Sequence, residues 1–278
     1  MRKKVLTGLS GLVVVILFTA LLLAGCGGGS SGFNSLTSLA KMAPQDSETI
    51  FFIDVKNFKS DTELGELYNE MKDSFNDEIA AASSERDIIS FEDIHYLGLV
   101  IVNGQEIVWV NGDLNLEAIR DALEEDDYEK DTYQGVEIWY GYDDAVAIHN
   151  GTLILGDETI VEESVEAIVD PENSAYENNE DIRDVVRETP SGLFSILTLD
   201  QFFFGSRGMG MSFSKSSADL MKFEGCFVFD DNDYAEDAVS GIESDMESGG
   251  LYQIEARRSG NVVKFAAEID MEDTSLFW

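Results

Sequence analysis

The sequence predicts an α+β protein with a largely antiparallel sheet and packed helices, and three observations lead to this fold class. Asn103-Gly104 and Asn150-Gly151 each separate two runs rich in apolar and β-branched residues. Asn-Gly in this setting is the strongest short hairpin signal, because both residues accept positive φ. A third hairpin is indicated over residues 251–269, turning at Ser259-Gly260-Asn261. Segments with helical apolar spacing connect the hairpins, which favours antiparallel sheet over a doubly wound parallel one.

The first predicted elements are a buried strand and an amphipathic helix. Residues 49–55 carry large apolar side chains in close succession, as buried strands do. Over residues 64–79 apolar side chains recur at helical spacing and predict a helix whose apolar stripe packs on the sheet. The first hairpin follows, with strands over 96–102 and 106–110.

Helices are predicted on either side of the second hairpin, whose strands cover 145–149 and 152–155. Asn115 is placed to cap the helix before this hairpin. Thr159 and Glu162 have the spacing of a capping box for the helix after it, which Pro171 ends.

The last third of the chain continues this alternation, with elements predicted at 179–187 (helix), 193–199 (strand), 223–229 (strand) and 235–246 (helix). The order of strand, long connection, strand, helix and hairpin can be written for residues 46–188 and again for residues 189–278. This order predicts that the ectodomain consists of two diverged, similar halves.

The N-terminus has the layout of a secretory signal peptide, with three basic residues before an uncharged, largely apolar run from Val5 to Leu23. The run ends in Leu23, Ala24, Gly25 and Cys26, which match the lipobox at all four positions. The N-terminus therefore resembles that of a bacterial lipoprotein precursor. This resemblance implies recognition of Leu23, Ala24 and Gly25 by a signal peptidase, cleavage before Cys26, and lipidation of the Cys26 sulfur.

An uncleaved transmembrane helix is the alternative, because residues 5–23 are long enough to cross a bilayer. Both interpretations place the remainder of the chain outside the cytoplasm. In the lipoprotein interpretation, residues 1–25 are the signal peptide and residues 26–45 are the lipidated Cys with a flexible Gly/Ser tether. The folded ectodomain is then expected to start near Asp46.

The chain is strongly acidic, with 18 Lys and Arg against 55 Asp and Glu and a net charge of -37. Cleavage after Gly25 would remove three bases and no acid, and so change the net charge to -40. Such a surface repels nucleic acid and anionic lipid, so the acyl chains and not a basic patch are expected to hold the protein at the membrane.

The motif search finds no catalytic or metal-binding pattern. His95 and His149 stand apart in predicted strands, and the spacings of zinc sites, serine hydrolases and nucleotide-binding loops do not occur. Ser-x-x-Lys occurs at Ser38 and at Ser212 without the partner motifs of penicillin-interacting enzymes. Cys226 lies in a strand-like run, where a Cys is usually a small buried apolar residue. We therefore expect no metal, no cofactor and no catalytic residue.

One weakly acidic stretch contrasts with the rest, and we call its apolar residues and single Arg the partner patch. The partner patch consists of Phe202, Phe203, Phe204, Arg207, Met209, Met211 and Phe213. If exposed, these side chains would contact a partner, a hydrophobic ligand or the membrane surface. In the alternative, the phenylalanines complete the core and the glycines between them form a loop.

Pro44-Gln45-Asp46-Ser47 leads into the first strand and Leu153-Ile154-Leu155-Gly156-Asp157 leads into a helix. Both segments resemble a family of bacterial extracytoplasmic proteins known as a domain of unknown function. The resemblance covers residues 44–200 and implies an extracytoplasmic location and an α+β fold. It supplies no catalytic residues.

Together these observations predict a lipid-anchored protein on the outer side of a cell membrane. We expect it to act as a non-enzymatic binding or envelope-associated module, whose partner is an envelope protein or another ligand and not nucleic acid. The alternatives are a solute- or cation-binding lipoprotein and, third, a hydrolase built from scattered carboxylates.

Overall fold

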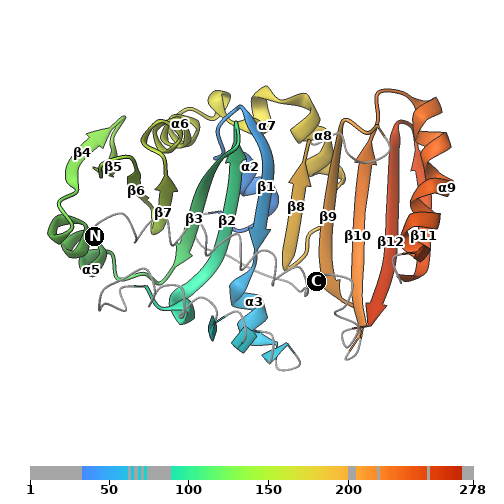
Figure 1. Ribbon diagram of the computed structural model, residues 1–278, viewed down its shortest axis with the longest axis horizontal. Coiled ribbons are helices and arrows are strands. Elements are labelled where there is room, and N and C mark those ends of the chain that lie inside the picture. Colours follow the sequence, from blue (N-terminus) through green and yellow to red (C-terminus); the bar gives the residue numbers. More distant parts are fainter. Residues whose placement is uncertain are drawn as a thin grey trace.

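A computed structural model describes residues 33–61, 64–65, 68–69, 72–73, 89–199, 205–217, 220–248 and 251–270. The described strands form one twelve-stranded sheet in the order β11-β12-β10-β9-β8-β1-β2-β3-β7-β6-β5-β4. Each pair of neighbouring strands in that sheet is antiparallel. In Figure 1 the sheet extends across the molecule from β4 at one end to β11 at the other. The predicted α+β class with antiparallel sheet is confirmed.

The junction between the two predicted halves of the chain lies where β1 pairs with β8, from Thr49 opposite Thr198 to Ile53 opposite Phe194. On one side of this junction lie β1 (Ser47–Ile53), β2 (Ile94–Val102), β3 (Gln105–Gly112), β7 (Thr152–Gly156), β6 (Ala145–His149), β5 (Val136–Tyr140) and β4 (Glu129–Tyr133). On the other side lie β8 (Phe194–Thr198), β9 (Gly208–Lys215), β10 (Leu220–Val228), β12 (Val262–Asp270) and β11 (Tyr252–Ser259). Residues on both sides of the boundary predicted at 188/189 thus share one sheet.

Helices cover both faces of the sheet. We name the two faces by the side chains that β9 places on each. Face A carries Phe213 and face B carries Ser212, since side chains alternate along a strand. Packed on face A are α3 (Val55–Ser60), the 3-10 turn η1 (Phe91–Asp93), α5 (Leu116–Glu125) and α9 (Asn232–Ser248). Packed on face B are α2 (Leu36–Ala40), α6 (Glu158–Val169), the 3-10 turn η2 (Pro171–Asn173), α7 (Ala175–Asn178) and α8 (Glu180–Glu188).

Residues 33–45, which were predicted to belong to the tether, are packed on the sheet, so that part of the prediction is wrong. Phe33 is fully buried, and its ring centroid lies 6.2 Å from that of Phe52 and 6.0 Å from that of Trp109. Leu36 and Leu39 of α2 are buried beside it. The physical reason is the spacing of these apolar residues at three-residue intervals, which gives even a single-turn helix one apolar face for the sheet.

Most local predictions of turns and caps are confirmed. Asn103 and Asn150 have φ of 51° and 48° in their hairpin turns. The side chain of Asn115 accepts a hydrogen bond from the backbone N–H of Ala118 at 3.2 Å and so caps α5. The capping box at Thr159 was wrong, because the cap is the preceding Asp157, whose carboxylate accepts from the Thr159 N–H at 3.0 Å.

The helix predicted over residues 64–79 is mostly untested, and the loop predicted at the glycines of the partner patch is partly wrong. Only residues 64–65, 68–69 and 72–73 of the helix predicted over 64–79 are described, so most of that helix lies outside the described residues. The loop predicted between the partner-patch glycines is wrong from Gly208 onward, because residues 208–215 form the inner strand β9.

Candidate functional site

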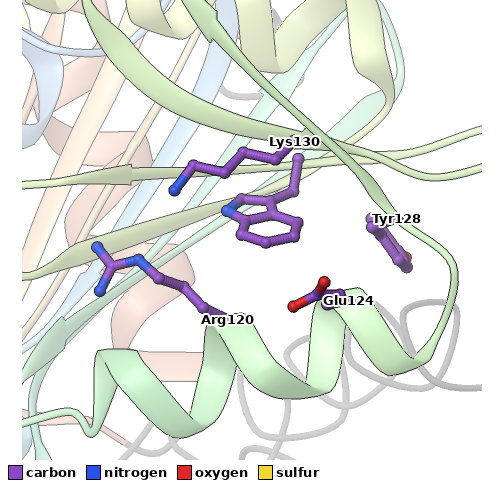
Figure 2. A pocket seen from close by; sticks show the side chains of 5 residues that line it. Arg120, Glu124, Tyr128 and Lys130 are labelled. Atoms are coloured by element: carbon purple, nitrogen blue, oxygen red, sulfur yellow. The ribbon is translucent and has the colours of Figure 1, made fainter.

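The candidate site is a hollow at one end of the sheet, between α5 and the β4–β5 hairpin. It has a volume of about 360 Å³ and is lined by Arg120, Glu124, Tyr128, Lys130 and Trp139. Figure 2 shows Arg120 and Glu124 on the helix, with Lys130 across from them on the hairpin. We call this feature the α5 hollow.

The sequence of α5 explains how the hollow is lined. Ile119 and Leu123 are buried against face A, which anchors the helix. Arg120 and Glu124 follow them by one position and are four residues apart, so they lie on one side of the helix. In the hairpin, Lys130 pairs with Trp139 and both face the helix. The turn residues Gln134 and Gly135 have φ of 48° and 86°, which positions this pair.

Glu137 does not line the hollow, but it contacts three of the side chains that do. Its carboxylate accepts two hydrogen bonds from Arg120, at 2.8 and 3.0 Å, and one from the Trp139 indole N–H at 2.8 Å. The Lys130 ammonium lies 3.2 Å from the same carboxylate. The hydrogen bonds from Arg120 are the main cause that lowers the pKa of Glu137 to about 2. Two cations thus share one carboxylate that is charged at neutral pH.

Aromatic groups make up the remainder of the hollow. The Lys130 ammonium lies 5.3 Å from the centroid of the Trp139 ring, within range of a cation–π interaction. Burial, assisted by the nearby Asp144 carboxylate, raises the pKa of Tyr128. Both Glu137 and Tyr128 therefore have pKa values displaced away from neutrality, whereas a general acid or base needs a pKa near the working pH.

The predicted lipidation residues Leu23, Ala24, Gly25 and Cys26 lie outside the described residues, as do Phe202, Phe203 and Phe204 of the partner patch. The hollow itself was missed by the sequence analysis. The signal that could have found it is the Gln134-Gly135 turn between two short alternating segments, one of which carries Trp139.

The described part of the partner patch is not an exposed surface. Met209 and Phe213 are 3% and 2% exposed and face the cores on face A, so the exposure that a partner contact would require is absent at these two residues. Met211, between them, is half-buried. The phenylalanine ring of residue 213 lies 5.6 Å from that of Phe194 and 4.9 Å from that of Phe223, centroid to centroid. The alternative interpretation, in which the phenylalanines complete the core, is correct for Phe213, and Met209 is buried as well.

Arg207 of the partner patch is held by carboxylates rather than presented to a partner. It forms ion pairs with Asp181 and Asp184 of α8, the latter at 3.5 Å, and with Asp230 at 3.6 Å. Its backbone N–H donates to the Val228 carbonyl at 2.7 Å. Arg207 therefore fixes the start of β9 against α8.

The two histidines and the cysteine lie apart from the hollow's base. His95 is 3.3 Å from Asp113, and His149 hydrogen-bonds the Asn150 side chain at 2.8 Å, with its pKa lowered by burial. Cys226 is fully buried, and burial raises the pKa of its thiol to about 11, as expected for an apolar strand residue. Within the described residues, no three His, Cys, Asp or Glu side chains are grouped as metal ligands.

Neither Ser-x-x-Lys copy has catalytic geometry. Ser38 forms a reciprocal capping box with Ser35. In the second copy, Ser212 and Lys215 are three residues apart on β9, so their side chains lie on opposite faces of the sheet. Lys215 instead pairs with Asp61 at 2.9 Å.

No family model matches the chain. The uncharacterized protein MJ1281 of Methanocaldococcus jannaschii is 27% identical over 129 residues, which are 46% of this chain and only 12% of that protein. The resemblance to the extracytoplasmic domain family stays a prediction.

Among solved structures, crystal forms III and IV of TP0453 superpose with TM-scores of 0.49 and 0.47, each at 6% sequence identity. These superpositions cover 87% and 85% of this chain and 96% and 93% of the compared chains. In the part of the chain that the structure describes, no helix is both long and apolar enough to span a membrane.

Proposed function

We propose that this protein is a lipid-anchored extracytoplasmic protein that acts as a non-enzymatic binding or envelope-associated module. The observation that carries the proposal is the apolar run of residues 5–23, closed by Leu23, Ala24, Gly25 and Cys26. The burial of Phe33 is consistent with it, because only six residues of the sequence, 27–32, separate Cys26 from a side chain of the packed domain.

Replacement of Cys26 tests the anchor. Cys26→Ala removes the sulfur that accepts diacylglycerol, so the variant should stay an uncleaved precursor without lipid. Metabolic labelling with a fatty-acid analogue measures this, and Cys226→Ala is the matched control that should keep its label. Equal incorporation into the parent and Cys26→Ala proteins would reject the anchor.

The α5 hollow favours one second candidate, a solute-binding lipoprotein. Its volume of about 360 Å³ and its combination of Trp139 with Arg120, Lys130 and Glu124 are suited to a small polar molecule. Trp139→Phe removes the indole donor to Glu137 while keeping an aromatic ring. A solute that binds the parent and loses affinity in this variant would support the second candidate.

We also propose that the two halves of the ectodomain are diverged copies. Outward from the central junction, β1-β2-β3 on one side and β8-β9-β10 on the other follow in the same order. Each half continues with a helix and a hairpin, namely α5 with β4–β5 and α9 with β11–β12, and the first half adds β6–β7. Sequences of relatives in which the halves align with each other would test this origin.

A further inference from the structure

Lys130 places a positive charge of the chain itself inside the α5 hollow. Its ammonium lies 5.3 Å from the centroid of the Trp139 ring and 3.2 Å from the Glu137 carboxylate. Aromatic faces are what proteins use to recognise organic ammonium ions, and the carboxylate supplies the opposite charge. The Lys130 side chain is about half exposed, so its ammonium can move into solvent at little cost. The position on the ring is thus suited to a cation and can be vacated.

The charges around the hollow favour a cation once Lys130 has moved away. Four charged side chains that line it or contact its lining sum to zero, namely Arg120, Lys130, Glu124 and Glu137. When the Lys130 ammonium leaves, the other three sum to -1, and a monovalent cation restores the balance. The surroundings have the same sign, because residues 116–144 contain eleven Asp or Glu and two Lys or Arg. This field attracts cations and repels anions.

The other side of the hollow offers further contacts to a cation. In Figure 2, Lys130 and Arg120 extend toward one side, and Glu124 and Tyr128 lie at the other. Among the described residues, the Glu124 carboxylate has neither a hydrogen bond nor an ion pair. A ligand larger than one ammonium group can therefore use the volume of about 360 Å³ to reach a second carboxylate and a second aromatic side chain. These additional contacts allow it to compete with a side chain that is already in place.

We propose that the α5 hollow binds a small organic ammonium ion, whose positive group replaces the Lys130 ammonium on the Trp139 ring. This inference rests on the second candidate function, solute binding in the same hollow, and names the class of solute. Lys130 is then an internal competitor that leaves when the ligand enters. Arg120 keeps the Glu137 carboxylate in place during this exchange, because its two hydrogen bonds to it, at 2.8 and 3.0 Å, do not involve Lys130.

Three probes of similar shape and different charge test the sign of the ligand. Choline is the cation, tert-butylethanol is its uncharged analogue, and tert-butylacetate is the anion. Titration calorimetry of the full-length protein in an uncharged detergent, at constant ionic strength, measures the affinity for each. We expect saturable binding of choline, and binding of the uncharged analogue that is weaker by roughly tenfold.

Lys130→Gln distinguishes a cation from an anion. Removal of the internal competitor should tighten the binding of choline about fivefold, whereas an anion that used the Lys130 ammonium would bind more weakly. Lys222→Gln is the matched control, because Lys222 is also partly exposed and forms an ion pair, at 2.7 Å from Glu224, on strand β10. It removes the same charge from the protein and should leave the affinity for choline within about twofold of the parent value.

Glu124→Gln tests the second carboxylate. This variant should bind choline about threefold more weakly than the parent, because it loses one of the two negative charges next to the ligand. Asp121→Asn removes a carboxylate from an exposed position of α5 that does not line the hollow, and it should bind choline as the parent does.

Two results would overturn the cation and leave solute binding standing. One is tighter binding of tert-butylacetate than of choline, with a loss of affinity in Lys130→Gln. The other is choline binding that Lys130→Gln leaves unchanged or weakens, because Lys130 would then not compete with the ligand. If neither the parent nor Lys130→Gln binds any of the three probes, the result counts against both the cation and the solute-binding candidate.

Discussion

The two ends of the sheet have the same local architecture and different contents. At one end α5 is followed by the β4–β5 hairpin, and at the other α9 is followed by the β11–β12 hairpin. Beneath α9 the contacts are apolar, with Ala235, Ala238 and Ile242 packed on Val263 and Phe265. Beneath α5, Ile119 and Leu123 are buried in the same way, but Arg120, Lys130 and Glu137 replace further apolar contacts.

This difference shows that the fold does not require a hollow. At the α9 end, the helix packs on the sheet through apolar side chains on face A. The α5 end stays open because its helix and hairpin present ionic and indole groups that are satisfied through Glu137. The ionic and indole groups of the α5 hollow are not needed to form the fold. They are therefore better candidates for function than side chains that pack the core.

The largest expected effect is at the closed end. Phe265→Ala removes a ring that is 4% exposed and lies 5.2 Å and 5.3 Å from the rings of Phe223 and Phe227, centroid to centroid. We expect a loss of about 3–5 kcal/mol in the free energy of unfolding, measured by urea denaturation. Tyr234→Ala on the exposed side of α9 is the control and should change it by less than about 0.5 kcal/mol. A loss below 1 kcal/mol for Phe265→Ala would contradict a closed core there.

A smaller effect is expected at the α5 end when Glu137 loses its charge. Glu137→Gln keeps the shape of the side chain but leaves Arg120 and Lys130 without their shared carboxylate. Since the pair is partly exposed, we expect a loss of about 1–2 kcal/mol in the free energy of unfolding, measured in the same way. The matched control is Glu129→Gln, on the exposed side of the neighbouring strand. Equal effects of the two substitutions would mean that Glu137 does not organise the hollow.

The pH dependence of the same pair gives an independent measurement. The pKa of Glu137 is lowered from 4.5 to about 2 by Arg120, so its contribution to stability is complete above pH 4.5. It is lost as the pH falls through the folded-state value, between about pH 4.5 and pH 2. The difference in unfolding free energy between the parent and Glu137→Gln should therefore shrink across that range. A difference that stays constant down to pH 2 would assign the lowered pKa to another group.

Local signals in the sequence were sufficient for most of the sheet. The Asn-Gly turns at Asn103 and Asn150 and the cap at Asn115 depend on residues close in sequence, and all three are confirmed. The start of the fold was not found in this way. Phe33 lies immediately after a Gly/Ser stretch, and its importance depends on Phe52 and Trp109, which approach it only in the folded chain.

Strand β9 was missed for a different reason. Its alternation of glycine or serine with Met209, Met211 and Phe213 has the period of a strand, but glycine and serine are also typical of loops. They are small because α8 crosses face B there. A Cβ at Gly210 would come within 1.8 Å of the Thr189 hydroxyl and 2.8 Å of a Val185 methyl. This requirement comes from tertiary packing, which sequence periodicity does not contain.

The smallest effect on stability is expected for Lys130, and it separates an open hollow from a filled one. The Lys130 side chain is about half exposed, so Lys130→Gln should change the free energy of unfolding by less than about 1 kcal/mol. The substitution removes the cation from above the Trp139 ring, however, and leaves Arg120 as the only cation on Glu137. The indole should then become more accessible to dissolved quenchers, which fluorescence quenching measures.

The control for Lys130→Gln is the same substitution in a Trp139→Phe background, where any change in quenching must come from other tryptophans. An increase that disappears in this background assigns it to Trp139. If quenching of the parent already equals that of Lys130→Gln, the ammonium does not shield the ring. Solutes could then reach the Trp139 ring without displacing the Lys130 side chain. The difference in solvent access between the α5 end and the α9 end would be larger than the position of Lys130 indicates.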